Sequence, residues 1–492
     1  MRIDKETFDR LDSTRPRLMP WLALLFVGSA ALGVYFLVSP ATGSGAYYRS
    51  VLNRMTYGYN RQVLLLFVPY GLALWSWWRG SRVSWKLLLG GAVFLHLLVL
   101  FAPLPQSQDF YQYLFYGRMQ AAYRANPYVI QPLRYWTDPW YIIRWPYQTS
   151  VYGPAWTLLS FGVAKAAGSS LTLAVVLMKL AILAMDLSVM ASILALSRDR
   201  PDPERAAGWG LLLYAWNPLI LITVPLGGLA DVGIAAAILG AVVARRRGRT
   251  WVATILLTLA TLVKIYGGIA LILHLVLLAK ERGRRGLQRH GLLAAGMVAA
   301  ASAPYWAGWQ TFRGLIRIAD LSNKSLTGTI QKLLMSVLRF IGVGAARNDA
   351  AAIIRWGVFA GLFAAVVWAV RRVKTERDVW HGTAVVLSIY VLLTPWYLYW
   401  YLVTPLALFA ILPRSRFTVP LVVFTGTTLI TTPFRPWLLG QVVQTVIRYG
   451  PPIAVYAWLR SRDGEASITM RRKAFTAPPV ARADPGRFVT LV

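Results

Sequence analysis

Long apolar runs separated by short clusters of Arg and Lys constrain this chain more than any other feature. Hydrophobic residues make up 57% of the sequence and charged residues only 14%, which is more apolar surface than a soluble domain can bury. Because about twenty apolar residues cross a bilayer as one helix, a chain of 492 residues can cross it many times. The sequence therefore predicts an all-α polytopic membrane protein.

The basic clusters indicate how this protein is oriented. The net charge is +33, and most Lys and Arg lie between apolar runs, for example at 245–249, 280–289 and 371–377. Such clusters are typical of cytoplasmic loops. They also favour contact with anionic membrane lipids, whereas their distribution does not favour nucleic-acid binding. We expect a multi-pass plasma-membrane protein with both termini in the cytoplasm.

The apolar runs predict about 12 to 14 transmembrane helices. The expected spans are 21–38, 63–79, 86–104, 171–196, 207–223, 229–244, 250–263, 267–279, 291–309, 353–370, 379–393, 398–412, 417–431 and 440–459. Several are too short for a full crossing, which favours broken or tilted helices around a cavity. Segment 156–167 is expected to be an interfacial or re-entrant helix, because a crossing there would move every later basic cluster outside.

The expected organisation has three parts. A cytoplasmic N-terminus covers 1–20, the transmembrane domain covers 21–459, and a disordered cytoplasmic tail covers 460–492. Two external loops interrupt the spans, at 105–170 and 310–352. The first is long and rich in turn residues, so we expect it to contain short interfacial helices and the active site.

The composition limits the chemistry. The chain has no Cys and only four His, which excludes thiolate metal sites and Cys nucleophiles and leaves little material for a His-rich metal centre. Catalysis is expected to use carboxylates, Arg, Lys and hydroxyl groups. We expect no required cofactor and no built metal site, although a loosely held divalent ion at Asp109 stays compatible with the sequence.

Few carboxylates are expected on the external face. All five Glu and most Asp fall on the cytoplasmic side of the predicted topology. Asp109 directly follows the third apolar run, at a depth where a carboxylate is partly desolvated and can reach both a lipid phosphate and an aqueous substrate. Asp231 in the sequence GGLAD begins a span from the same side, where a helix-capping role competes with a functional one. Asp186 lies within a span and predicts a polar contact with Lys179 or with a neighbouring helix.

Two external cations are candidate phosphate ligands. Arg118 lies nine residues after Asp109, and a guanidinium can hold a phosphate through two hydrogen bonds. Lys264 ends an apolar run at the same face, where phosphate binding competes with simple extension of the ammonium toward the head groups.

Aromatic residues dominate the external segments. An interfacial aromatic belt explains many of them, but the accompanying Pro and Gly turns favour a rigidly shaped platform for sugar rings and isoprenoid chains. The candidate substrate-binding residues at this face are Tyr113, Tyr116, Asn126, Tyr128, Tyr152, Asp231, Trp396 and Tyr397.

These motifs, in this order, resemble a known family. DFYQYLFYGR runs from Asp109 to Arg118 and is followed by NPY at 126–128, VYGP at 151–154, GGLAD, Lys264 and PWY at 395–397. The pattern is similar to that of bacterial polyprenol-phosphate-mannose-dependent mannosyltransferases of the glycosyltransferase C (GT-C) superfamily, over most of residues 86–412. Two motifs depart from it: the family's loop often begins DVYSY, and its GGHND is GGLAD here.

The resemblance implies a GT-C-like fold and a mechanism. Asp109 matches the proposed general base of that superfamily. The donor would be a polyprenyl-phosphate sugar, with mannose favoured, and the acceptor an envelope glycan or glycolipid on the external face. Arg118, with Lys264 as a second cation, would hold the donor phosphate, and the anomeric configuration would invert.

Other functions stay open at this point. Another lipid-linked transfer on the same fold would move an arabinosyl, glucosyl or aminoarabinosyl group, or ligate an oligosaccharide. A transporter or lipid flippase is also polytopic, but it usually carries ionisable residues near mid-bilayer, and few are present here. A non-catalytic scaffold would explain the aromatic belts but not the external acid with an Arg nearby.

Overall fold

The computed structural model describes residues 18–38, 63–100, 108–319, 321, 325–412, 415–430 and 438–476. Every regular element within these ranges is a helix, which confirms the all-α class. Most of the expected N-terminal segment lies outside the described residues, as does the tail from 477 onward. Between 460 and 476, where disorder was expected, the last helix continues.

The described helical elements differ widely in length. In chain order they are α2 (Met19–Val38), the helix Val63–Trp78, α4 (Trp85–Leu100), α5 (Gln108–Tyr123), η1 (Pro132–Tyr135), α6 (Pro154–Ala167), α7 (Leu171–Ser197), α8 (Pro203–Tyr214), α9 (Pro218–Thr223), α10 (Asp231–Arg246), α11 (Thr250–Val263), η2 (Ile265–Gly267), α12 (Gly268–Ser302), η3 (Ala303–Tyr305), η4 (Gln310–Phe312), α13 (Arg313–Ala319), α14 (Leu326–Phe340), α15 (Ala346–Arg372), α16 (Glu376–Leu393), η5 (Tyr399–Leu402), α17 (Val403–Ala410), α18 (Thr418–Thr427) and α19 (Leu438–Thr476).

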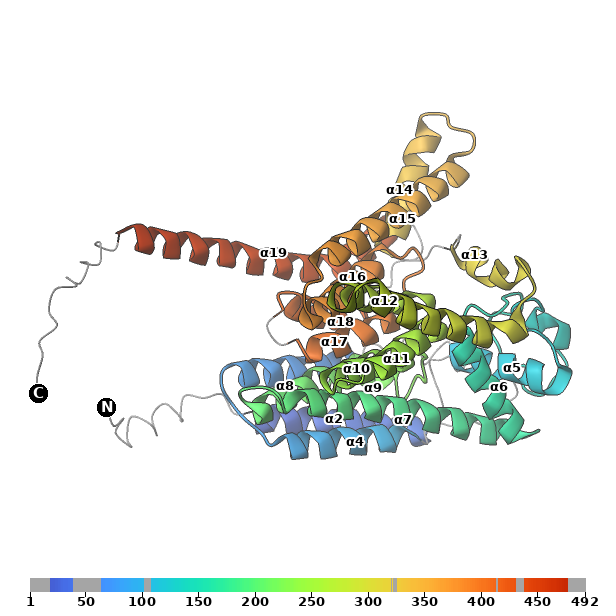
Figure 1. The fold of residues 1–492 in the computed structure, drawn as a ribbon, viewed down its shortest axis with the longest axis horizontal. Coiled ribbons are helices and arrows are strands. Elements are labelled where there is room, and N and C mark those ends of the chain that lie inside the picture. Colours follow the sequence, from blue (N-terminus) through green and yellow to red (C-terminus); the bar gives the residue numbers. More distant parts are fainter. Residues whose placement is uncertain are drawn as a thin grey trace, which may run out of the picture.

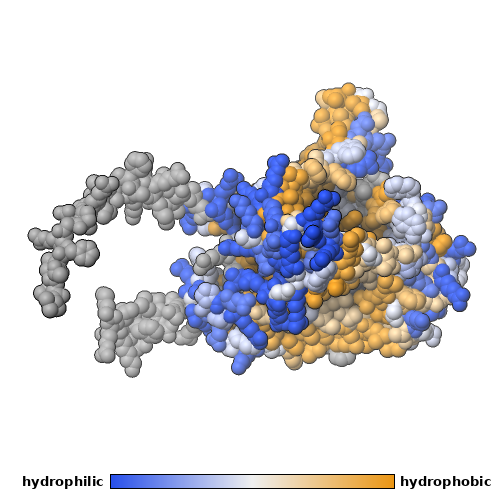
Figure 2. All heavy atoms as spheres, in the orientation of Figure 1, coloured by the Kyte–Doolittle hydropathy of each residue, from blue (hydrophilic) through white to orange (hydrophobic). Residues whose placement is uncertain are grey.

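The helices form an elongated bundle (Figure 1). Helices α2, α4 and α7 run along its length, α5, α6 and α13 gather at one end, and the α14–α15 hairpin projects from its side (Figure 1). α10 packs against both α7 and α11 in the interior. Figure 2 shows a hydrophobic surface along the middle of the bundle and hydrophilic residues at both ends.

Two described helices, Leu171–Ser197 and Ala346–Arg372, are long and apolar enough to cross a membrane, and several shorter apolar helices accompany them. With the hydrophobic surface between hydrophilic ends, they make this a helical membrane protein. Most predicted spans coincide with a helix, although their ends move by several residues. The segment 156–167, expected to be an interfacial or re-entrant helix, is helical as α6.

Three predicted spans are differently built. The span 207–223 is divided into α8 and α9, because Pro218 starts a new helix whose first turn is capped by the Asn217 side chain, which accepts from the Leu219 amide at 2.9 Å. The spans 267–279 and 291–309 both fall largely within α12, which has non-helical geometry at Gly283.

The two parts of α12 fold back on each other at Gly283. His274 and His290, on either side of this residue, have ring centroids only 6.4 Å apart, which a straight helix of that length would not allow. Both rings lie within hydrogen-bonding distance of the Thr254 hydroxyl on α11, at 3.1 and 2.7 Å. This segment is therefore an antiparallel helix pair, as the basic cluster between the two spans predicted.

A buried polar cluster joins three helices in the bundle. The Tyr214 hydroxyl donates to Asp186 Oδ1 at 2.9 Å, and His96 Nε2 lies 3.4 Å from Asp186 Oδ2. Lys179 instead donates to the backbone carbonyl of Leu100. Asp186 was expected to contact either Lys179 or a neighbouring helix. The structure shows the second alternative, with contacts from α7 to both α4 and α8.

Candidate active site

An aromatic cavity lies between the start of α5, the loop before α6, the end of α11 and the segment around η5. Its volume is about 330 Å³. Residues from segment 109–152, from the end of α11 and from the segments around α13 and η5 line it: Asp109, Gln112, Tyr116, Arg144, Trp145, Gln148, Val151, Tyr152, Lys264, Ile265, Tyr266, Leu315, Leu321, Tyr390, Trp396, Leu398, Trp400 and Tyr401.

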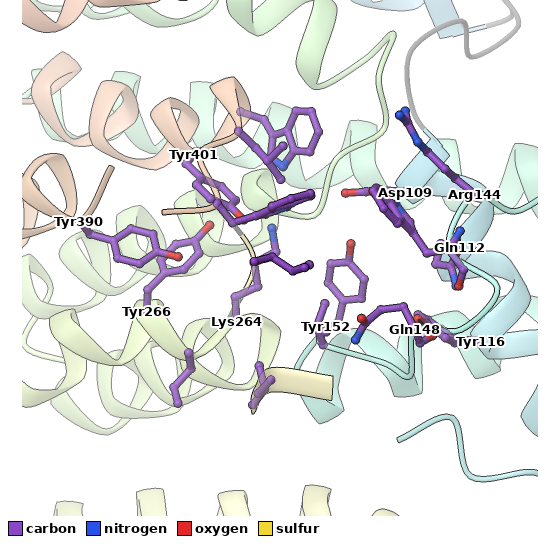
Figure 3. Close-up of a pocket in the computed structure, with 18 residues that line it drawn as sticks. Asp109, Gln112, Tyr116, Arg144, Gln148, Tyr152, Lys264, Tyr266, Tyr390 and Tyr401 are labelled. Atoms are coloured by element: carbon purple, nitrogen blue, oxygen red, sulfur yellow. Dashed lines mark hydrogen bonds between the residues drawn. The ribbon is translucent and has the colours of Figure 1, made fainter. Parts of the chain in front are cut away.

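Asp109 lies in the first turn of α5 and faces the cavity (Figure 3). Burial raises the pKa of this carboxyl, while the charge of Lys264 and hydrogen bonding from Tyr152 work against that increase. A carboxylate with a raised pKa holds a proton more tightly and is a better general base than a solvated one.

The GGLAD turn fixes the start of α5. Gly228 has a φ of +67°, and a Cβ there would lie 2.4 Å from Cδ2 of Phe110. Only glycine suits both this backbone geometry and this contact. Since Phe110 follows Asp109, the turn holds the carboxylate near the N-terminus of α10, which begins with Asp231.

Lys264 lies just after α11, where the backbone becomes extended. Its ammonium is 2.7 Å from Asp231 Oδ2 and lies over the rings of Tyr401, Tyr152 and Tyr266, with centroids at 5.2, 5.6 and 5.9 Å. The hydroxyl of Tyr266 donates to the other oxygen of Asp231. Lys264 is therefore a cation held by one carboxylate and three rings. Its side chain lines the cavity (Figure 3).

The VYGP motif brings Tyr152 to this cation. The Gly153 amide donates to the Val263 carbonyl at 2.8 Å, and a Cβ on Gly153 would lie 2.1 Å from the Leu262 carbonyl oxygen. The loop can approach the end of α11 only without a side chain at this position. As a result, the Tyr152 ring lies between Asp109 and Lys264 in the cavity wall (Figure 3).

Arg118 lies elsewhere. Its Nε donates to Asp138 Oδ2 at 3.1 Å, one terminal nitrogen donates to the Gly168 carbonyl at 3.0 Å, and the guanidinium covers the Trp140 ring at 5.1 Å. It does not line the cavity, so the structure does not support the expected contact with a donor phosphate. Nine residues along an α-helix turn a side chain to roughly the opposite face, which separates Arg118 from Asp109.

Arg144 is the second cation of the cavity, and our sequence reasoning missed it. It is exposed at the cavity wall, with its guanidinium 5.2 Å from the centroid of the Trp145 ring. The sequence offers little to distinguish Arg144, because it is one of several Arg in a loop rich in Trp and Tyr.

The helical period of α5 identifies further lining residues. Gln112 and Tyr116 lie three and seven residues after Asp109, and both face the same cavity. The Tyr116 hydroxyl donates to the Gln148 carbonyl at 2.7 Å, so this expected substrate residue also braces the loop. Tyr113 is buried behind the wall, with its ring 4.6 Å from that of Tyr152.

Asn126 and Tyr128 shape the loop from outside the cavity. The Asn126 side chain donates to the Tyr305 carbonyl at 2.9 Å and accepts from the Tyr128 amide at 3.0 Å. The Tyr128 hydroxyl donates to the Tyr152 carbonyl at 2.7 Å. Neither side chain lines the cavity, so the direct substrate contacts expected for them are not supported.

The PWY motif is divided in the same way. Trp396 lines the cavity, with its ring 5.9 Å from that of Trp145. Tyr397 is buried and stacks on Phe424 outside the cavity. Within the described residues, no group of three or more His, Asp or Glu side chains gathers in a way that would hold a metal ion.

The chain combines an apolar helical bundle (Figure 2) with an aromatic cavity that holds a carboxylate and two cations. Its similarity to known proteins identifies it as a mannosyltransferase of the GT-C type. The family model described as "Alpha-(1->6)-mannopyranosyltransferase, N-terminal domain" matches residues 21–280, more than half of the chain, and the chain belongs to this family. The chain is also similar to alpha-(1->6)-mannopyranosyltransferase A of Mycobacterium tuberculosis (strain ATCC 25618 / H37Rv), with 26% identity over 403 residues that cover 74% of this chain and 73% of the relative.

These relationships confirm the resemblance to mannosyltransferases. The protein is an enzyme, a mannosyltransferase of the membrane, and the transporter and scaffold alternatives no longer apply. As a mannosyltransferase, the protein uses a sugar donor and a glycan acceptor.

Proposed function

We propose that this enzyme transfers mannose from a polyprenyl-phosphate donor to a hydroxyl of an envelope glycan or glycolipid on the external face of the plasma membrane. The observation that carries the proposal is the meeting of Asp109 and Lys264 in one cavity, although 155 positions separate them in the sequence. A general base and a cation for a leaving phosphate are the two groups that this transfer needs.

The placement of the cavity supports an external reaction. Helix α10 begins with Asp231 beside the cavity and ends with Arg245 and Arg246. Its 16 residues span about 24 Å, close to the thickness of a hydrocarbon core. The ion pairs of Arg245 with Glu281 and Glu376 lie at that far end, where basic residues cluster. Basic clusters prefer the cytoplasm, so the cavity belongs to the other face of a multi-pass protein with both termini inside.

The reaction proceeds by direct displacement at the anomeric carbon. Asp109 accepts the proton of the acceptor hydroxyl as that oxygen bonds to the anomeric carbon, through an oxocarbenium-like transition state. The bond between the anomeric carbon and the donor phosphate oxygen breaks, and its electron pair leaves with the polyprenyl phosphate. The configuration inverts, so an α-linked product requires a β-linked donor.

Two cations take the charge of the departing phosphate. Lys264 lies beside Tyr152 and Tyr401 in the cavity wall, and Arg144 lies on the side of Asp109 away from Lys264 (Figure 3). Arg144 takes the role that the sequence favoured for Arg118, because Arg118 is engaged with Asp138 outside the cavity. Since Lys and Arg supply the positive charge, the proposal requires no metal ion and no other cofactor.

Replacing Asp109 with Asn tests the proposal. In membranes supplied with polyprenyl-phosphate mannose, Asp109→Asn is expected to lower mannosyl transfer by roughly 10² to 10⁴-fold, the usual contribution of a positioned base. Asp349→Asn, at an exposed acid near the start of α15, is the matched control and should transfer at the wild-type rate. Transfer by Asp109→Asn at a rate near that of wild type would rule out this mechanism.

A further inference from the structure

Asp231 is fully buried, and both of its carboxylate oxygens have partners within the protein. Oδ2 accepts from the Lys264 ammonium at 2.7 Å, and Oδ1 accepts from the Tyr266 hydroxyl. The backbone carbonyl of Asp231 accepts from the Thr404 hydroxyl at 3.2 Å. Asp231 does not line the cavity, so the substrate contact expected from the sequence is not supported.

Lys264, in contrast, does reach the cavity, and its side chain is 12% exposed. A lysine side chain is flexible and can place its ammonium at many positions. Here the ammonium contacts Asp231 and the rings of Tyr152, Tyr266 and Tyr401, which favour this position over others. A cation that is already in place stabilises a developing negative charge without reorganisation, which is where electrostatic catalysis gains most.

We propose that Asp231 is a positioning residue for mannosyl transfer, which acts through Lys264 by fixing its ammonium beside the place where the departing phosphate takes up charge. This inference rests on the proposed function. It assigns to Asp231 no contact with donor or acceptor, and it leaves the bond changes at the anomeric carbon as described above.

Lys264 and Asp231 also have opposite effects on the pKa of the general base, Asp109. The charge of Lys264 lowers the pKa of Asp109, and the charge of Asp231 raises it. The other titratable or charged groups around Asp109 come from α5, the loop before α6 and the segment around η5: Tyr113, Tyr116, Arg144, Tyr152, Tyr399 and Tyr401. None of these is replaced in the main test below, so the shifts expected there come from the pair.

A double-mutant cycle tests the coupling. Lys264→Met is expected to lower kcat by about 10²-fold and to raise the donor KM, and Asp231→Asn to lower kcat by about tenfold. If Asp231 acts through Lys264, the double variant is no slower than Lys264→Met. A double variant whose loss is the product of the two single losses would overturn the proposal.

The pH profile gives a second measure that a merely structural role would not produce. The acidic limb of kcat/KM reports the base, which is active only when deprotonated. Lys264→Met removes a charge that lowers the pKa of Asp109, so the limb moves to higher pH. Asp231→Asn removes a charge that raises it, so the limb moves to lower pH. Shifts in the same direction, or no shift in either variant, would contradict the proposal.

Asp138→Asn is the matched control. Asp138 is also a buried external carboxylate paired with a cation, Arg118, but it lies outside the cavity. The control should lose thermal stability as Asp231→Asn does while keeping the wild-type donor KM and pH limb. If Asp231→Asn fails to fold, Tyr266→Phe removes the second partner of Asp231 without changing charge. It is expected to lower kcat severalfold, and a wild-type kcat would count against the proposal.

These outcomes separate the two levels of the argument. If the wild-type enzyme transfers no mannose from polyprenyl-phosphate mannose, the proposed function fails. If the wild type is active and Asp231→Asn and Lys264→Met act independently, only the role of Asp231 fails.

Discussion

Gly153 lies against Leu262 so closely that a Cβ on Gly153 would come within 2.1 Å of the Leu262 carbonyl oxygen. The loop before α6 and the end of α11 meet at this contact, and it places Tyr152 over the Lys264 ammonium. The site therefore depends on a backbone approach as much as on its polar side chains.

The variant Gly153→Ala is expected to separate the loop from α11. Overpacking of this kind costs about 1–3 kcal/mol, and a displacement of about 1 Å at a reacting group costs on the order of 10²-fold in rate. Mannosyl transfer and thermal melting in detergent measure both effects. Gly162→Ala on α6 is the control, because a Cβ there meets nothing within 4 Å. Equal activities of the two variants would show that the contact is not needed.

Arg118 and Arg144 are expected to behave differently. Arg144→Ala should raise the donor KM about tenfold, because it removes a cation from the cavity. Arg118→Ala should leave the donor KM unchanged and lower the melting temperature, because it leaves the buried Asp138 without its ion-pair partner. Donor titrations of both variants measure the two KM values. If only Arg118→Ala raised the donor KM, Arg118 and not Arg144 would be the phosphate ligand.

On acidification, the enzyme should lose activity at a higher pH than an enzyme whose general base is a solvated carboxylate. Because burial raises the pKa of Asp109 and its deprotonated form is the base, kcat/KM decreases as the pH falls through that raised value. An ordinary Asp has a pKa of about 3.9. A pH profile of kcat/KM in detergent or membranes measures the limb, and a limb at or below the ordinary value would argue against Asp109 as the base.

Chelation should not affect transfer. Lys264 and Arg144 supply the positive charge in the proposed mechanism, so dialysis against EDTA is expected to leave the rate of mannosyl transfer within about twofold of its starting value. Loss of activity that Mg²⁺ or Mn²⁺ restores would place a divalent ion at Asp109 instead.

Much of the fold was predictable from hydrophobicity and charge. The apolar runs predicted most helices, and the basic cluster at 280–289 predicted the antiparallel halves of α12. A helix was also expected at 156–167, where α6 lies. The ends of helices were less predictable. They depend on local capping, such as that of Leu219 by Asn217, which hydrophobic periodicity does not report.

The site was predicted in part. Of the candidates, Asp109, Tyr116, Tyr152, Lys264 and Trp396 line one cavity. Arg118 was chosen for its nearness in sequence to Asp109, whereas the helical period of α5 places the two on opposite faces. Arg144 and Tyr401 reach the cavity through the course of a loop and the packing of η5, and such long-range placement leaves no periodic signal in the sequence.

The seating of Phe110 on Gly228 links the base to the start of α10, and Gly153 links the loop to the end of α11. These two contacts hold Asp109 beside α10 and Tyr152 beside the end of α11, so we expect a shift of either backbone to displace a cavity residue. Leu315 and Leu321 border the same cavity from a different part of the chain. We expect substitutions at Leu315 and Leu321 to change the shape of the cavity while leaving Asp109, Lys264 and Arg144 in place.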